Sequence, residues 1–374
     1  MPGIYIHIPF CRLACHYCDF HFSTNLSLKE QMLRMICREI EMQSSYLEKE
    51  ELKTIYFGGG TPSLLSHKEL SEIVESLHKE FQISSKAEVT LEANPDDLDE
   101  VTISNLKKSG INRLSIGVQS FNDDHLKYLN RIHTGQDAFN CVRKAQQAGF
   151  DNISIDLIYG IPAGNYEIWE KDLEIALGLG IRHISSYCLT IEKSTVFGKW
   201  LQKKIIKPID EEMAARQFEI LMKTLQTHGF EHYEISNFSL PGYTSRHNSN
   251  YWSGKNYLGI GPGAHSYNGR ERQYNISNNP AYIKAIENGQ IPATVEKLTE
   301  KDKINEYLIT SLRTKWGCDL NLLKGKPEFD FLRQESKINK MEFDKLLINN
   351  NGILILTDKG KLLADKIIYD LFLI

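Results

Sequence analysis

Three cysteines, Cys11, Cys15 and Cys18, stand within eight residues near the start of the sequence. Their spacing is C-x3-C-x2-C, and no fourth cysteine lies close by. A cubane iron–sulfur cluster normally takes four thiolates, so three thiolates would leave one iron with an open coordination position. The triplet therefore predicts a cluster at which a reactant can bind.

A zinc site is the alternative interpretation of the triplet, because His16 and His21 are near enough to supply a fourth ligand. The remaining cysteines stand singly, at Cys37, Cys141, Cys188 and Cys318. We expect these four to be small buried hydrophobic side chains. Seven cysteines in 374 residues do not form a disulfide framework, and the grouping of three favours cluster or metal binding.

The composition is that of a globular protein. Its 41% hydrophobic content over 374 residues suffices for two domains, or for one large α/β domain with an appendage. A net charge of −4 argues against nucleic-acid binding. No signal-peptide pattern is present, and no apolar run approaches the roughly 18 residues of a membrane span. We expect a cytoplasmic protein with no nucleic-acid partner and no stable membrane insertion.

Short β-branched runs alternate with amphipathic helical patterns in the first half of the chain. The strand-like runs are residues 4–8, 54–57, 88–92, 113–118, 153–158 and 183–189. The helical patterns are residues 28–46, 67–81, 99–109, 137–148 and 166–177. Such alternation predicts a parallel sheet with helices outside it. Six units favour a partial (β/α)6 barrel of the TIM type, with a two-sided nucleotide-binding fold as the alternative.

Polar or glycine-rich sequence follows every predicted strand. The cysteine loop follows the first strand and Gly58-Gly59-Gly60 the second. The later strands end at or contain Glu92, Gln119, Asp156 and Thr190. Because the carboxyl ends of barrel strands converge on one face, we expect these residues to form one site.

The chain is predicted to have three parts. Residues 1–230 form the barrel core, and a helix at 210–228 leads into an extension at 231–297. Residues 298–374 form a separate α+β domain, whose two helical patterns, strand, turn and final helix resemble a winged-helix module. This segment carries no basic stripe, which favours packing or interaction over DNA binding.

These motifs together resemble the radical S-adenosylmethionine superfamily, and within it the branch of oxygen-independent coproporphyrinogen III oxidase and HemW-type haem chaperones. The resemblance covers nearly the whole chain. It is carried by YIHIPFC at 5–11, FGGGTP at 57–62, GVQSF at 117–121, LNRIH at 129–133 and IDLIYGIP at 155–162.

The resemblance implies that the three cysteines ligate a 4Fe–4S cluster whose open iron is chelated by S-adenosylmethionine. One electron, from a low-potential donor, then cleaves the sulfonium and releases a 5′-deoxyadenosyl radical. The implied cofactor-binding residues are Tyr5, Tyr17, Gly59, Gly60, Thr61, Glu92, Gln119, Arg131, Asp156 and Thr190.

The residue types suit these implied roles. Gly59 and Gly60 let the backbone approach the methionine moiety. The Glu92 carboxylate can bind the ammonium group or ribose hydroxyls, and the Arg131 guanidinium can pair with the methionine carboxylate. Tyr17 stands where an aromatic ring shields the cluster.

Two departures argue against the oxidase. The oxidase has a further cysteine where this chain has Phe20, and it has a long N-terminal lead that is not expected here. Residues 247–252 read H-N-S-N-Y-W and match the H-N-x-x-Y-W motif of HemW-type proteins. The resemblance therefore implies haem binding by His247 as an axial ligand, with Tyr251 and Trp252 against the porphyrin. A buried structural histidine is the alternative.

The leading hypothesis is a haem chaperone that hands haem to acceptor haemoproteins and lacks coproporphyrinogen oxidase activity. The alternative is a radical enzyme that decarboxylates the propionates of coproporphyrinogen III. A radical enzyme acting on another substrate is a third hypothesis.

Overall fold

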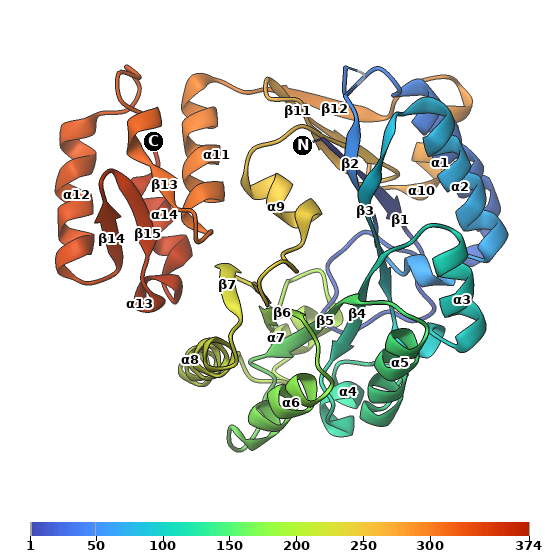
Figure 1. Ribbon diagram of the computed structural model, residues 1–374, viewed down its shortest axis with the longest axis horizontal. Helices are drawn as coiled ribbons and strands as arrows, with labels where there is room; N and C mark the ends of the chain where they lie inside the picture. The colour runs from blue at the N-terminus through green and yellow to red at the C-terminus, as the bar shows by residue number, and fades with distance from the viewer. Residues whose placement is uncertain (1, 49, 374) are drawn as a thin grey trace.

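The computed structural model describes residues 2–48 and 50–373, and its centre is one curved sheet (Figure 1). The sheet order is β12-β11-β10-β9-β1-β2-β3-β4-β5-β6-β8-β7. The consecutive parallel strands are β1 (Gly3–Ile8), β2 (Leu52–Gly59), β3 (Ile83–Ala93), β4 (Arg113–Gln119), β5 (Asn152–Tyr159) and β6 (His183–Cys188). These six strands confirm the predicted partial barrel. All form at the predicted places, although β3 begins at Ile83 instead of the predicted residue 88.

Helices cover the outer face of this sheet, as predicted. They are α1 (Lys29–Met42), α2 (His67–Glu80), α3 (Glu100–Lys108), α5 (Gly135–Gln147), α6 (Glu167–Gly178) and α8 (Glu211–Thr227). Ser66 and Thr134 begin α2 and α5 with capping boxes, close to the starts predicted at residues 67 and 137. Two short helices were not predicted, α4 (Asp123–Tyr128) and α7 (Val196–Gln202).

The two faces of the parallel sheet differ in polarity. Alternate residues such as Ile4, Ile6 and Ile8 point outward and join the main hydrophobic core with the helices. The intervening positions, among them Thr54 and Arg113, are buried polar side chains. Because side chains alternate along a strand, the barrel interior is polar.

Additional strands extend the sheet at both ends. β7 (Glu231–Glu234) and β8 (Asn237–Ser239) follow β6, whereas β9 (Tyr257–Ile260) pairs parallel with β1. Beyond β9 lie β10 (His265–Tyr267), β11 (Glu271–Asn275) and β12 (Ala293–Lys297), with α10 (Asn279–Glu287) between the last two. The sequence predicted no elements for most of this region.

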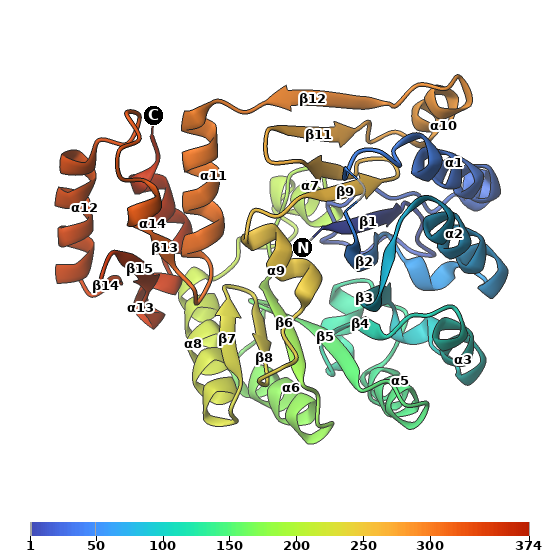
Figure 2. The ribbon, with the colours of Figure 1, turned by 45° about the horizontal axis from the view of Figure 1, so that its top comes forward.

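Helix α9 (Arg246–Trp252) occupies the opening between the two ends of the sheet (Figures 1 and 2). It lies against β2 on one side and against α11 (Glu300–Leu312) on the other. The helix carries the H-N-x-x-Y-W motif, so the motif is held inside the barrel opening rather than on an outer surface.

The C-terminal segment forms its own hydrophobic core around a three-stranded antiparallel sheet. After α11 it contains β13 (Cys318–Asp319), α12 (Phe331–Phe343), β14 (Leu347–Asn350), β15 (Ile353–Leu356), α13 (Asp358–Lys361) and α14 (Ala364–Leu371). The predicted small α+β domain is confirmed, and the β14–β15 hairpin stands where a wing is expected. Within residues 2–48 and 50–373, no helix combines the length and apolar character that crossing a membrane requires.

A buried carboxylate joins the sheet extension to the barrel. Glu39 of α1 accepts hydrogen bonds from the Gly261 backbone N–H (2.8 Å), the Asn275 side-chain amide (2.7 Å) and the Tyr282 hydroxyl (2.5 Å). Its side chain is fully enclosed. Burial raises the pKa of Glu39 to about 7, although the three donors oppose this shift.

We predict that Glu39→Gln removes a pH dependence of stability. Glu39 binds its proton more tightly in the folded chain than in the unfolded one, so native stability falls as pH rises from about 4.5 to 7. The full effect is on the order of 3 kcal/mol. Denaturant unfolding at pH 5 and pH 8 measures it, with Glu41→Gln, an exposed carboxylate on the same helix, as the control. This role would be contradicted if the free energy of unfolding of Glu39→Gln changed between pH 5 and pH 8 as much as that of the unsubstituted protein.

Candidate functional site

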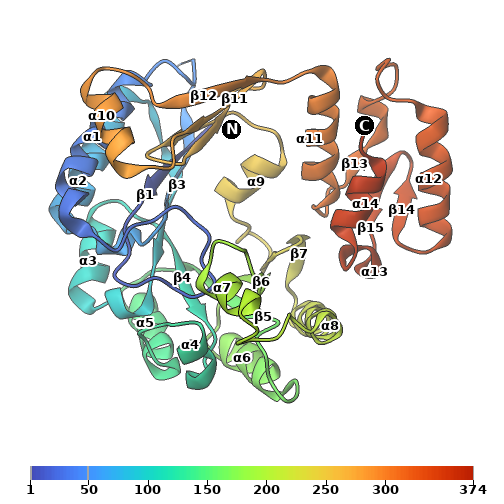
Figure 3. The same ribbon diagram turned by 180° about the vertical axis from the view of Figure 1, so that it is seen from behind.

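A cavity of about 440 Å³ lies at the carboxyl ends of the parallel strands. Seen from behind, the loop after β1 crosses this end beside α7 (Figure 3), where the Phe197 N–H donates to the His16 carbonyl at 3.0 Å. The cavity wall contains all three cysteines of the triplet. It also contains nine of the ten predicted cofactor-binding residues: Tyr17, Gly59, Gly60, Thr61, Glu92, Gln119, Arg131, Asp156 and Thr190.

The cysteine loop is held by Asn130 and Arg131, shortly after the end of α4. Asn130, at φ 62°, donates from its side-chain amide to the Ala14 carbonyl at 2.7 Å. The next residue, Arg131, donates to the Cys15 sulfur at 3.4 Å and also to the Asn94 side-chain oxygen at 2.6 Å. A fixed positive charge therefore lies beside the sulfur of one predicted cluster ligand.

Asp97 ties the cysteine loop to the loops after β2 and β3. Its buried carboxylate forms an ion pair with Arg12 at 2.9 Å and accepts a hydrogen bond from the Ser63 hydroxyl at 2.8 Å. Thr61 also donates to the Cys11 sulfur at 3.4 Å. Sequence reasoning missed Asp97, because an aspartate next to a proline-containing turn has no distinctive spacing.

The two histidines near the triplet bear on the zinc interpretation. Within residues 2–48 and 50–373, no three His, Cys, Asp or Glu side chains are placed to hold one metal ion. His16 and His21 are engaged elsewhere, with the Tyr128 carbonyl at 3.0 Å and the Asn279 side chain at 2.7 Å. In a cubane the three thiolates bind three different irons, so their sulfurs stand further apart than around a single ion. The residues present therefore fit a cluster better than zinc.

The glycine loop after β2 is shaped by the protein's own packing. Gly59 adopts φ +107°, and a Cβ there would lie 2.5 Å from the His7 ring. A Cβ on Gly60 would lie 2.6 Å from the Phe10 carbonyl oxygen. Glycine is thus required at both positions because the loop packs closely against His7 and Phe10. This requirement is separate from any close approach of a ligand from the cavity side.

Two partly buried carboxylates, Glu92 and Asp156, line the cavity from the inner face of the sheet. Glu92 accepts from the Tyr56 hydroxyl (2.8 Å) and the Gly59 N–H (3.1 Å), and Asp156 accepts from the Ser115 hydroxyl (3.3 Å). Burial, reinforced by neighbouring Asp156, raises the pKa of Glu92 to about 7. Burial also raises the pKa of Asp156 to about 6. A bound cation would favour ionisation of both groups.

Gln119 reaches the cavity from a strained backbone position, with φ 67° at the end of β4. The next residues are anchored by the buried Asp172 carboxylate of α6. It accepts from the Ser120 hydroxyl at 2.6 Å and from the Phe121 N–H at 2.7 Å. This anchoring holds Gln119 in a conformation that non-glycine residues seldom adopt.

One of the ten predicted cofactor-binding residues, Tyr5, lies outside the cavity wall, and its hydroxyl is hydrogen-bonded to His7 Nδ1 (3.0 Å). A part for Tyr5 in cofactor binding stays a prediction. The prediction that Cys188 is a buried hydrophobic residue is wrong: it is exposed and lines the cavity beside Tyr187. Tyr187 and Cys188 lie at the end of β6, where the chain leaves the sheet. The alternation of inward and outward side chains no longer predicts burial there. Cys37 is only partly buried, whereas Cys141 and Cys318 are buried as predicted.

The residues of the H-N-x-x-Y-W motif lie apart from this cavity wall. His247 is 2% exposed, and both of its ring nitrogens are hydrogen-bonded within the protein, to Thr54 and Tyr251. Burial lowers the pKa of His247 to about 3, so the imidazole is neutral. Haem ligation by His247, with Tyr251 and Trp252 alongside, stays a prediction that this enclosed conformation does not display.

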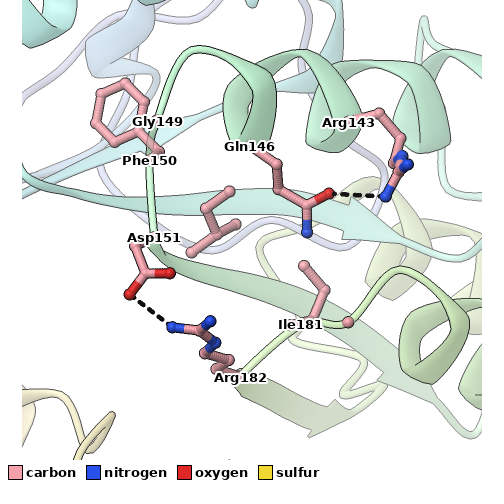
Figure 4. Close-up of a pocket in the computed structure, with 9 residues that line it drawn as sticks. Arg143, Gln146, Gly149, Phe150, Asp151, Ile181 and Arg182 are labelled. Atoms are coloured by element: carbon pink, nitrogen blue, oxygen red, sulfur yellow. Dashed lines mark hydrogen bonds and ion pairs between the residues drawn. The ribbon is translucent and has the colours of Figure 1, made fainter.

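A second cavity, of about 330 Å³, lies at the amino ends of β5 and β6 (Figure 4). Its two arginine side chains already have partners in the protein. Arg182 meets Asp151 at 2.6 Å, and Arg143 donates to Gln146 at 3.4 Å. It contains none of the predicted site residues, so we assign no function to it.

Comparison with known proteins agrees with this geometry. Residues 5–176 match the sequence profile of the Radical SAM superfamily, and residues 298–363 match that of the HemN C-terminal domain. The chain is 36% identical over 371 residues to the heme chaperone HemW of Bacillus subtilis, with 98% of each chain covered. It is 35% identical over 364 residues to the heme chaperone HemW of Lactococcus lactis, covering 97% of this chain and 95% of that one.

A solved structure shows the same fold over almost the whole chain. Coproporphyrinogen III oxidase (HemN) from Escherichia coli, described as a radical SAM enzyme, matches with a TM-score of 0.84 and 23% identity. The match covers 98% of this chain and 89% of that one. With the extended similarity to the bacterial heme chaperones, these findings show that the chain belongs to the HemW heme chaperone family of the radical SAM superfamily.

Proposed function

We propose that this protein is a haem chaperone that binds haem, one 4Fe–4S cluster and S-adenosylmethionine, and transfers haem to acceptor haemoproteins. The observation that carries the cofactor part is the single cavity that gathers the cysteine triplet, the glycine loop and two inward carboxylates. The haem part is supported by whole-length similarity to proteins named heme chaperone HemW, and by the H-N-S-N-Y-W helix.

Each group of residues has a defined task in this proposal. Cys11, Cys15 and Cys18 hold the cluster, and Arg131 places a positive charge beside it. Glu92 and Asp156 supply negative charge for a ligand that carries ammonium and sulfonium groups. When bound, the cluster and S-adenosylmethionine would supply one-electron reductive chemistry, for which a low-potential donor is needed.

The rim of the cavity supports a chaperone over coproporphyrinogen decarboxylation. Phe20 stands where the oxidase branch has a further cysteine, and its side chain is 72% exposed. Leu13, 40% exposed, lies on the same cavity wall. Exposed apolar side chains at this edge of the cavity suit contact with an apolar ligand or partner.

We predict that the cluster-reconstituted protein binds haem stably and transfers it to an apo-haemoprotein, without converting coproporphyrinogen III. Both reactions are measured anaerobically with S-adenosylmethionine and a reductant, by the haem absorbance and by product analysis. His247→Ala should lower haem binding and leave the cluster absorbance intact. Turnover of coproporphyrinogen III without stable haem binding would overturn the proposal.

Binding of S-adenosylmethionine should depend on pH through Glu92 and Asp156. Both carboxyls lose a proton as pH rises through about 6 to 7, so affinity for the cationic ligand should increase over this interval and then level off. Glu92→Gln should weaken binding about ten-fold at pH 8, the size expected for one charged hydrogen bond, and flatten the profile.

Equilibrium dialysis of S-adenosylmethionine against the cluster-loaded protein between pH 5.5 and 8.5 provides this measurement. Glu170→Gln, an exposed carboxylate on α6, is the matched control and should follow the unsubstituted protein. A steep pH profile that survives in Glu92→Gln would exclude Glu92 as a titrating group of the site.

Asp97 should position the cysteine loop. Asp97→Asn loses the charge that faces Arg12, so the loop that presents Cys11 becomes less ordered and the reconstituted protein should retain less iron and sulfide. Glu100→Gln, an exposed change at the start of α3, is the control. Iron content equal to that of the unsubstituted protein, at equal circular dichroism, would show that the ion pair is dispensable.

A further inference from the structure

Helix α9 holds His247 in a closed state. Its Nδ1 lies 2.9 Å from the Thr54 hydroxyl, and its Nε2 lies 2.8 Å from the Tyr251 hydroxyl. An imidazole binds iron through a nitrogen lone pair. With both nitrogens occupied and the ring enclosed, His247 can reach a haem iron only after one of these bonds breaks and the ring leaves its pocket.

The helix is attached to the barrel by a set of polar contacts at its first turn. The Glu88 carboxylate of β3 accepts from the backbone N–H groups of Arg246 (3.1 Å) and His247 (2.9 Å). The Arg246 side chain also donates to the Lys86 carbonyl at 2.8 Å, and Asn250 donates to Thr54 at 3.3 Å. A carboxylate at a helix N-terminus accepts hydrogen bonds from N–H groups that have no partner within the helix. Its negative charge also interacts favourably with the helix dipole.

Three consecutive contacts connect this helix to the cofactor cavity. The His247 ring stacks on Tyr56, with ring centroids 5.0 Å apart and an interplanar angle of 27°. The Tyr56 hydroxyl donates to Glu92, which in turn accepts from the Gly59 N–H. Glu92 and Gly59 are in the cavity wall, so the haem motif and the cavity share one side of β2 and β3.

Glycines flank the helix where a hinge would be needed. Gly242 precedes it with φ +87°, and Gly254 follows it with φ +61°. A Cβ added at either position would meet nothing within 4 Å, so there is open space beside both glycines. Short open segments of this kind can absorb the backbone rotation that a moving element requires.

We propose that α9 is a latch, and that its release for haem ligation by His247 weakens the S-adenosylmethionine site through Tyr56 and Glu92. The proposal rests on the proposed function, since it concerns the same two ligands. Haem favours the released helix, whereas S-adenosylmethionine favours the docked one, so the two ligands bind antagonistically. Coupling of this kind is reciprocal, and each ligand should weaken the other by the same factor, about five-fold or more.

The test uses the full chain with its cluster reconstituted anaerobically. The dissociation constant of S-adenosylmethionine is measured with and without saturating haem, and that of haem with and without saturating S-adenosylmethionine. We expect both constants to rise by the same factor in the presence of the other ligand.

Tyr251→Phe separates a latch from a merely structural helix. It keeps the aromatic ring but removes the hydroxyl that occupies His247 Nε2, so haem should bind about five-fold more tightly, the size of one lost hydrogen bond. The affinity for S-adenosylmethionine should fall. Tyr166→Phe, an exposed tyrosine beside α6, is the control and should change neither constant.

Each remaining outcome overturns a defined part of the account. If both ligands bind with constants independent of each other, the latch is wrong and the proposed function stands. If haem binding in His247→Ala equals that of the unsubstituted chain, the latch is also wrong. If no haem binds to the unsubstituted chain, the proposed function fails and the latch fails with it.

Discussion

The polar inner face of the parallel sheet is the constraint on which the other features of this protein depend. The outer side chains of β1 to β6 are apolar because they pack against helices, and this leaves polar groups such as Thr54, Glu88 and Glu92 inside. Buried polar groups are costly unless they are hydrogen-bonded. The cofactor cavity and helix α9 both adjoin this polar interior. They are connected through Tyr56, whose ring stacks on His247 and whose hydroxyl donates to Glu92.

The cysteine loop shows how this interior organises a segment that has no regular structure of its own. Its geometry comes from other elements: Asn130 binds its backbone, Arg131 binds Cys15, and Asp97 binds Arg12. Charges of opposite sign lie in different parts of the cavity wall. Arg131 faces the thiols, whereas Glu92 and Asp156 face the space in which a cation is proposed to bind. One end of the barrel thus offers separate environments for an anionic cluster and a cationic ligand.

Periodicity made much of the fold predictable. Six strands and their helices could be located from alternating and helical patterns, and strand-end residues such as Glu92, Gln119 and Asp156 converge because parallel strands end on one face. The contacts of α9 could not be predicted. The helix has seven mostly polar residues with little hydrophobic periodicity, and it is docked through Glu88, far away in the sequence. The motif could be recognised, and burial of His247 was the stated alternative, but its contacts with Thr54 and Glu88 could not be predicted.

Hydrogen exchange at the backbone amides of Arg246 and His247 tests most directly whether the haem motif and the cofactor site belong to one network. Both amides donate to Glu88 and should be protected while α9 is docked. In the cluster-loaded protein, the account predicts that haem accelerates their exchange and that S-adenosylmethionine slows it. Exchange at these amides that is unchanged or slower with haem bound would contradict it.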